Sequence, residues 1–273
     1  MKHHSICYHT LQDHPLFLSS VVVNYHKELK HQSSINFGRV YFALLYEKFI
    51  TIDCYGEKVF NPAMQLRPVS NYFSFSVKKG GKMVIVAMDS TRWFAISGEP
   101  ASLYNERVLD LYEIFPRELL DSLYAQCAHT NDAKHVVEIF DEHLGSFYQK
   151  WQKPFPIDDI VDEIFECQGM IKLSDILKKY PFAKSTLGVY FKKYIGYSPN
   201  FFIRLIQFNN IIREVENNGS RLSELIRHYN FYDYAHFRKS FKTFTGVNPI
   251  EYTTFKKASM MEDVFKKIDY RHF

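Results

Sequence analysis

Two related stretches of the chain decide its fold. They read LSDILKKYPFAKSTLGVYFKKYIGYSPNFF from Leu173 to Phe202 and LSELIRHYNFYDYAHFRKSFKTFTGVNPIEY from Leu222 to Tyr252. The two stretches align without a gap up to Tyr180 and Tyr229. After one residue inserted in the second stretch, the remainder of the two stretches aligns as well. The matched pairs are Leu173 with Leu222, Ser174 with Ser223, Asp175 with Glu224, Tyr180 with Tyr229, Leu187 with Phe237, Phe191 with Phe241, Lys192 with Lys242, Gly196 with Gly246 and Pro199 with Pro249.

Each stretch predicts two short helices joined by a tight turn. A Ser N-cap followed by a carboxylate favours the start of the first helix, and Gly and Pro favour the end of the second. We expect the pairs to be Leu173–Lys179 with Lys184–Ile195, and Leu222–His228 with Tyr232–Thr243. A longer helix, Asn200–Glu216, would join them, and an amphipathic helix, 157–166, would precede them. Two such pairs have the layout of two helix-turn-helix units.

A gapped motif in the second unit resembles the signature of the AraC/XylS family of transcription regulators. It runs NFYDYAHFRKSFK from Asn230 to Lys242, followed by Gly246, Asn248-Pro249 and Glu251-Tyr252. The resemblance covers about residues 157–255. Gln207 and Thr253 stand where the family commonly has arginines. The resemblance implies a tandem helix-turn-helix domain that binds double-stranded DNA, with RNA polymerase as a further partner.

The same resemblance makes Lys184–Tyr194 and Asp233–Thr243 the recognition helices. Side chains opposite their apolar faces would enter the major groove: Lys184, Ser185, Gly188, Val189, Tyr234, Ala235, His236, Arg238 and Lys239. Arg and Lys suit guanine, whose groove edge presents two acceptors. Phosphate contacts would come from Lys192, Lys193, Lys242 and Arg204, although a solvated surface charge explains any single one as well.

Gly188 is an unusual residue for a helix, because glycine costs about 1 kcal/mol relative to alanine there. A close approach of the helix backbone to DNA would explain it. Tight packing against another helix would explain it equally well.

The charge distribution separates the C-terminal third from the rest of the chain. Residues 1–171 carry 16 Lys/Arg against 21 Asp/Glu, whereas residues 172–257 carry 15 against 6. The excess of positive charge in the second range suits a polyanionic partner, although a solvated basic face would look the same.

The N-terminal half predicts strands followed by helices. Val40–Leu45, Phe49–Asp53, Phe73–Val77 and Lys82–Met88 are strand-like, with a hairpin turn at 78–81. The range 133–151 predicts an amphipathic helix, for pairing or for the core of its own domain. Prolines at 154 and 156 then interrupt the pattern.

The overall expectation is therefore an α+β chain of three segments. A cupin-like β-barrel domain for regulation or pairing would span residues 1–153, the DNA-binding domain 154–256 and a tail 257–273. An effector and a second copy of the chain are candidate partners. Aromatic residues of the first domain suit a ligand pocket but suit a barrel interior better: Tyr41, Phe42, Tyr46, Tyr72, Phe73, Phe75, Trp93 and Phe94.

Other functional classes lack their sequence patterns. There is no G-x-S-x-G, P-loop or H-E-x-x-H motif, which argues against common enzymes, and no cofactor is expected. The four cysteines are scattered, and the N-terminal histidines His3, His4, His9 and His14 suit a flexible polar terminus better than a metal site. The sequence has no apolar run that predicts a membrane span or a secretory signal. The scattered cysteines, which suggest no disulfide framework, fit a reducing cytoplasm best, so a cytoplasmic location is expected. The favoured function is a sequence-specific transcription regulator, more often an activator in this family. The alternative is an interaction protein that keeps the fold without reading DNA.

Overall fold

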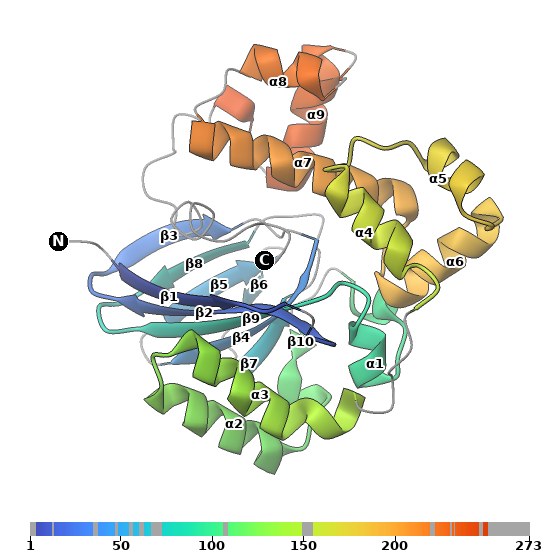
Figure 1. Cartoon of the computed structure of the whole chain (residues 1–273). Helices are drawn as coiled ribbons and strands as arrows, with labels where there is room; N and C mark the ends of the chain where they lie inside the picture. Colours follow the sequence, from blue (N-terminus) through green and yellow to red (C-terminus); the bar gives the residue numbers. More distant parts are fainter. Residues whose placement is uncertain are drawn as a thin grey trace.

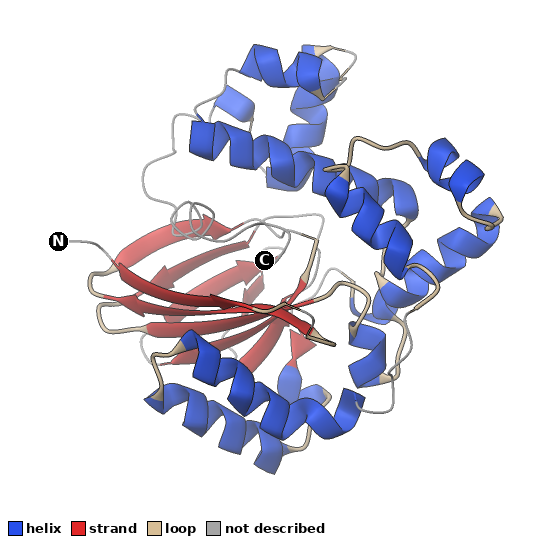
Figure 2. Cartoon of the chain, in the orientation of Figure 1, coloured by secondary structure: helices blue, strands red, loops and turns tan. Residues whose placement is uncertain are grey.

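The computed structural model describes the chain in segments. They are residues 4–12, 14–34, 38–46, 49–54, 57–59, 63–66, 73–105, 109–148, 155–218, 222–229, 231, 233–245 and 248–250. An N-terminal half of antiparallel strands and covering helices is followed by a helical half, so the α+β class is confirmed (Figures 1 and 2). The predicted tail, 257–273, and the signature residues Tyr252 and Thr253 lie outside the described residues.

Six strands form the first antiparallel sheet, in the order β1-β2-β9-β4-β7-β10. Their bounds are β1 (His4–Thr10), β2 (Phe17–Tyr25), β4 (Val40–Tyr46), β7 (Ala63–Leu66), β9 (Lys82–Met88) and β10 (Leu109–Asp110). The strand periodicity of two sends alternate residues of β4 to opposite faces. Tyr41, Ala43 and Leu45 join one apolar cluster and Phe42 and Leu44 another, so the sheet is buried on both faces at β4.

Four strands form the second sheet, in the order β3-β8-β5-β6. They are β3 (Leu29–Ser34), β5 (Phe49–Cys54), β6 (Glu57–Val59) and β8 (Phe73–Val77). Leu29 and Val77 belong to the same cluster as Tyr41, so the two sheets pack on each other. The predicted hairpin at 78–81 is wrong, because β8 pairs with β3 and β5 whereas β9 pairs with β2 and β4. The turn carries the chain between sheets, and Gly81 accepts a hydrogen bond from the backbone of Tyr25.

The predicted flexible N-terminus is also wrong for the described residues 4–12 and 14. Residues 4–10 form the edge strand β1, paired with β2 over its whole length. His14 then holds the chain against the helices, since its Nε2 lies 3.0 Å from both carboxylate oxygens of Asp141. Its Nδ1 accepts hydrogen bonds from the backbone of Leu16 and Phe17. His4, His9 and His14 therefore have structural positions, and His3 lies outside the described residues.

Helices cover the outer face of the first sheet (Figure 1). They are α1 (Trp93–Ser97), α2 (Arg117–His129) and α3 (Ala133–Tyr148), with the 3-10 turns η1 (Ala101–Tyr104) and η2 (Leu111–Glu113). Phe42 lies between Phe17, Phe115 and Phe140 in this layer, and Trp93 is fully buried beside it. Of the predicted pocket aromatics, Phe42, Tyr46 and Trp93 thus belong to the helix-facing core and only Tyr41 and Phe94 to the cluster between the sheets and the helical half. Tyr72 and the side chains of Phe73 and Phe75 lie outside what is described.

One lysine of β9 caps the helix layer. Lys82 Nζ donates to the carbonyl oxygens of Cys127, Ala128 and Thr130 at distances of 2.8, 2.8 and 2.5 Å. The last carbonyls of a helix have no partner within it, so a cation there satisfies them and complements the helix dipole. Burial lowers the pKa of Lys82 and raises the pKa of the Cys127 thiol to about 12. Lys82 therefore joins the sheet to the end of α2, and Cys127 stays protonated at neutral pH.

The helical half follows the predicted order closely. It comprises α4 (Asp158–Glu166), α5 (Leu173–Lys179), α6 (Lys184–Tyr194), α7 (Pro199–Asn218), α8 (Leu222–His228) and α9 (Tyr234–Thr245). Helix α7 lies between the two helix pairs, with α4–α6 beside one end and α8 and α9 beside the other (Figure 1). Phe202 contacts the rings of Phe165 and Phe191 on the first side, and Phe208 contacts Phe241 and Phe244 on the second. A single helix thus carries both units.

Local details of the first pair differ from expectation. Lys172 occupies the N-cap of α5 and makes no side-chain capping bond, so the predicted Ser174 cap is wrong. Ser174 lies one residue inside the helix, because the chain becomes helical already at Leu173. In the second pair α8 likewise begins at Leu222, before Ser223, so the predicted Ser cap is wrong there too. The second helix of that pair has a side-chain cap that was not predicted: Asp233 Oδ1 accepts a 2.7 Å bond from the backbone of His236 and starts α9.

A glycine after α4 fixes the first pair against α7. Gly169 has a φ of +72°, and a Cβ there would overlap the backbone nitrogen of Gln207 and the carbonyl oxygen of Ile203. Asn210 Nδ2 donates to the carbonyl oxygen of Gln168 beside it. Only glycine combines this conformation with such close backbone packing.

Candidate nucleic-acid interface

Helix α6 is divided lengthwise into a buried and an exposed face. Leu187 and Phe191 have no exposed surface and pack into the core of the helical half. Their spacing of four residues places them on one face of a helix, which the buried Tyr194 continues. Lys184 lies on the same stripe but in the first turn, where it is exposed. Away from that stripe, Ser185, Gly188, Val189 and Lys192 are exposed or partly exposed.

Helix α9 repeats this division. Phe237 and Phe241 are fully buried, in contact with each other and with Phe231 and Phe208. Every residue that the sequence assigns to DNA contact on this helix is exposed: Tyr234, Ala235, His236, Arg238, Lys239 and Lys242. The two helices therefore present comparable polar faces, as the repeat in the sequence predicts.

The charged side chains on α6 and α9 are all basic. Neither α6 nor α9 contains an acidic residue, whereas Lys184 and Lys192 are exposed on the first and Arg238, Lys239 and Lys242 on the second. Arg204 is exposed on α7 between them. Such a surface attracts a polyanion and repels a cation.

Lys193 differs from the other predicted phosphate contacts. It is half-buried, and its Nζ lies 4.3 Å from the centroid of the Phe94 ring in the N-terminal half. Tyr194 beside it packs on Phe94 and Phe155, with centroid separations of 5.4 and 4.6 Å. The C-terminal end of α6 is thus held by the strand-rich half while its N-terminal end remains accessible.

Gln207, which stands at an arginine position of the family resemblance, has an internal partner. Its Nε2 donates a 3.1 Å hydrogen bond to the carbonyl oxygen of Tyr229 at the end of α8. Tyr229 in turn donates to Glu214 of α7 over 2.7 Å. These bonds fix the second helix pair to α7, which is a structural role.

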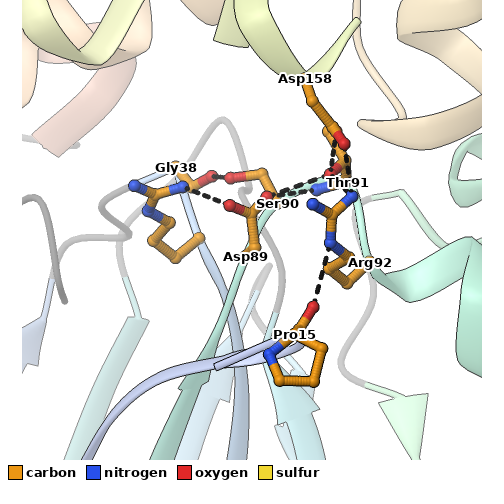
Figure 3. Close-up of polar contacts among 8 residues, drawn as sticks. Pro15, Gly38, Asp89, Ser90, Thr91, Arg92 and Asp158 are labelled. Atoms are coloured by element: carbon orange, nitrogen blue, oxygen red, sulfur yellow. Dashed lines mark hydrogen bonds and ion pairs between the residues drawn. The ribbon is translucent and has the colours of Figure 1, made fainter. Parts of the chain in front are cut away.

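A polar network joins the turn after β9 to the start of α4 (Figure 3). Asp158 accepts 2.7 Å hydrogen bonds from Thr91 Oγ1, Arg92 Nη1 and the backbone nitrogen of Phe155. Arg92 Nε also donates to the carbonyl oxygen of Pro15, and Asp89 accepts from Thr91. No local pattern in the sequence indicates this network, because its members lie far apart along the chain.

Two further contacts support that network. The guanidinium of Arg39 lies 3.6 Å from the centroid of Phe165 on α4, and its Nη1 is 3.5 Å from Asp89. Burial disfavours a charge on Asp89, but Arg39, Arg92 and the hydrogen bonds from Thr91 outweigh it and hold the pKa of Asp89 below its usual range. Asn105 Nδ2 donates a 2.5 Å bond to the carbonyl oxygen of Gly196 just after α6. Side chains of the strand-rich half thus contact both α4 and the end of α6.

Within the described segments no set of three or more His, Cys, Asp and Glu side chains gathers as metal ligands. Among those same residues no helix is long and apolar enough to cross a membrane.

Comparisons with known proteins find similarity in structure only. No family model matches the sequence, and no curated protein matches it. ToxT from Vibrio cholerae is similar over 93% of this chain and 98% of its own, with 10% identity and a TM-score of 0.50. ToxT bound to (E)-4-(8-methylnaphthalen-1-yl)but-3-enoic acid is similar over 94% and 100%, at 9% identity and a TM-score of 0.49. The AraC-like transcriptional activator CuxR gives a TM-score of only 0.28 at 9% identity, over 81% and 90%. The chain therefore shares with ToxT the α+β fold of a strand-rich half followed by a helical half.

Proposed function

We propose that this protein is a sequence-specific DNA-binding transcription regulator of the AraC type. Its two helix-turn-helix units, α5–α6 and α8–α9 within a DNA-binding domain of residues 154–256, enter successive segments of the major groove on one face of the duplex. The observation that carries the proposal is the matched division of α6 and α9, each with a buried apolar face and an exposed face without acidic residues.

The two helices have different roles in this proposal. Helix α9 reads bases through Arg238, Lys239 and His236, with Tyr234 and Ala235 beside them, and α6 reads through Ser185, Gly188 and Val189. Phosphate contacts come from Lys192, Lys242 and Arg204, which position the protein without specifying sequence. We add Lys184 to them and remove it from the groove residues, because it lies on the Leu187 stripe of α6. Lys193 remains at the contact with Phe94.

The strand-rich half modulates DNA binding through its hold on α4 and α6. Any event that shifts the turn bearing Thr91 and Arg92 also shifts α4, and through the packed helical core it shifts α6. A small-molecule effector or a second copy of the chain could supply that event. Activation through RNA polymerase is the regulatory outcome that we propose.

The experiment is a selection from random duplex DNA with the full chain, followed by titration of the selected site. Binding to six to ten phosphates predicts a loss of roughly 10³ to 10⁵ in affinity between about 50 and 200 mM salt. Arg238→Ala should weaken binding by about 1–3 kcal/mol and relax the preference at one base pair. Arg117→Ala, which removes an exposed arginine of α2 in the other half, is the control and should bind as the wild type does.

One observation favours a second function, that of an interaction protein that does not read DNA. Gln207, which replaces an arginine common in the family, is engaged with Tyr229, and Lys193, a predicted phosphate contact, is engaged with Phe94. If the full chain selects no site and its weak binding is insensitive to Arg238→Ala, this second function is the correct one. A selected motif with a steep salt dependence rejects it.

A further inference from the structure

The surroundings of Gly188 distinguish between the two explanations for a glycine inside α6. A Cβ at this position would meet no atom of the described chain within 4 Å. Packing against another helix therefore does not require glycine here. Glycine also weakens a helix, because it loses more conformational freedom on folding than any other residue. The described chain therefore gives no packing reason for glycine at this position.

The residues around Gly188 indicate which kind of partner molecule would fit against the exposed face of α6. Val189 follows it with 63% of its surface exposed, more than most apolar side chains of the described chain. Ser185 and Lys192 lie on the same face, and α6 has no carboxylate. An apolar side chain beside bare backbone, with a lysine on the same face and no carboxylate on the helix, suits a partner that is anionic outside and partly apolar where the helix touches it.

The major groove of duplex DNA has this chemistry. Its walls are phosphates, and the one apolar group that the bases present there is the C5-methyl of thymine. A glycine removes the Cβ that would otherwise separate the helix backbone from the base edges. The branched side chain of a valine can then contact a methyl group.

Building on the proposed function, we propose that the two units read chemically different half-sites. In the first unit Val189 reads a thymine methyl, and Gly188 allows the close approach that this contact needs. In the second unit Arg238 and Lys239 read the acceptor edge of guanine. The site is therefore asymmetric, with a thymine requirement on the α6 side and a guanine requirement on the α9 side.

The decisive experiment removes single methyl groups from the DNA. The selected duplex is remade with each thymine replaced in turn by deoxyuridine, which lacks only the C5-methyl, and the full chain is titrated against each. At one or two positions in the α6 half the affinity should fall roughly fourfold, the worth of one buried methyl group. Val189→Ala should lose this sensitivity, whereas Met170→Ala, which truncates an exposed apolar residue elsewhere in the helical half, should keep it.

A second variant tests the role of the glycine separately from folding. Gly188→Ala should raise the midpoint of thermal unfolding, because alanine favours the helix and has room. The same variant should bind the selected duplex several-fold more weakly. A change that stabilises the protein and weakens its binding cannot be a folding defect.

The outcomes separate this inference from the proposed function. A selected site that tolerates deoxyuridine everywhere, or that lacks thymine in the α6 half, overturns the inference and leaves the proposed function in place. Unchanged or tighter binding by Gly188→Ala also overturns it. If the full chain selects no duplex at all, the proposed function fails and the inference fails with it.

Discussion

Asp158 and Arg92 form a 2.7 Å ion pair that joins the first helix of the helical half to the turn after β9. Both side chains are largely buried, and Thr91 and the backbone of Phe155 complete the hydrogen bonding of the carboxylate. A charged hydrogen bond that is shielded from water contributes more than one on the surface. This pair is therefore a main polar determinant of how the two halves are held.

Replacing the carboxylate tests that statement. Asp158→Asn should lower the free energy of unfolding by about 1–3 kcal/mol, because the amide cannot accept all three bonds and leaves Arg92 without its anion. Urea unfolding of the full chain measures the change. Asp175→Asn is the matched control, since its pair with Lys178 is more than half exposed on both sides and should contribute about 0–1 kcal/mol. Equal effects for the two variants would refute a special role for Asp158.

Asp162 makes the same region sensitive to pH. Burial and the nearby carboxylates of Asp89 and Asp158 raise the pKa of Asp162 to about 6, against the opposing influence of Arg39 and Arg92. A carboxyl whose pKa is raised on folding stabilises the protein when protonated. Its contribution should be complete below pH 4 and lost as the pH rises through about 6.

The variant Asp162→Asn removes this contribution. The difference in unfolding free energy between the variant and the wild type should change by at most about 1 kcal/mol between about pH 4 and 7, a modest size because Asp162 is exposed and solvent screens its interactions. Urea titrations at several pH values measure it. Parallel pH profiles for the two proteins would show that Asp162 titrates normally.

Gly169 should tolerate no side chain. Gly169→Ala combines a left-handed backbone conformation with overlap against the backbone of α7, and a main chain cannot move aside as a side chain can. We expect a loss of about 2–4 kcal/mol of stability. Gly98→Ala is the control, since it has a similar φ of +71° but open space around it, and should cost about 1–2 kcal/mol. A smaller loss at Gly169 than at Gly98 would contradict the close packing of α7.

Lys82 should stabilise the sheet and α2 together. Lys82→Met keeps most of the apolar stem and removes the donor of three carbonyl hydrogen bonds, so about 2–4 kcal/mol of stability should be lost. The exposed neighbour Lys78 provides the comparison, and Lys78→Met should change stability by less than about 0.5 kcal/mol. Thermal unfolding followed by circular dichroism would measure both variants.

The sequence predicted the helical half well because its signals are local. Helices α5, α6 and α8 begin at the predicted residues. The spacing of apolar residues within each helix, and the prolines and glycines between helices, are local features of the sequence and predict these bounds. The exposed positions of α9 follow from the buried Phe237 and Phe241 in the same way. The separation of site residues into exposed and buried was therefore within reach of the sequence.

The strand-rich half was predicted less completely. Strand β2 was missed because it is buried on both faces, so its Val21-Val22-Val23 run shows no alternation. Strand β1 was mistaken for a polar tail because an edge strand with one exposed side carries histidines. The pairing of β8 and β9 with different sheets depends on partners distant in sequence, and no turn residue encodes it.

The contacts of the site with the rest of the molecule could not be predicted at all. Arg92 and Asp158 are 66 residues apart, and the sequence around each gives no indication that they form a pair. The choice between the two explanations for Gly188 likewise needed the space around it, which only the folded chain defines.

The packing of Phe94 and Phe155 on Tyr194 has a consequence for how freely the two halves can be exchanged. In many regulators a reading module and a sensing module are recombined as separate pieces. Here the end of α6 completes an apolar surface whose other side belongs to the strand-rich half, and Phe155 and Tyr194 are almost fully covered. A chimera that grafts this helical half onto a foreign sensor would uncover the side of those rings that Phe94 covers, and exposed apolar surface favours aggregation. A replacement sensor would therefore have to supply an aromatic surface in the place of Phe94.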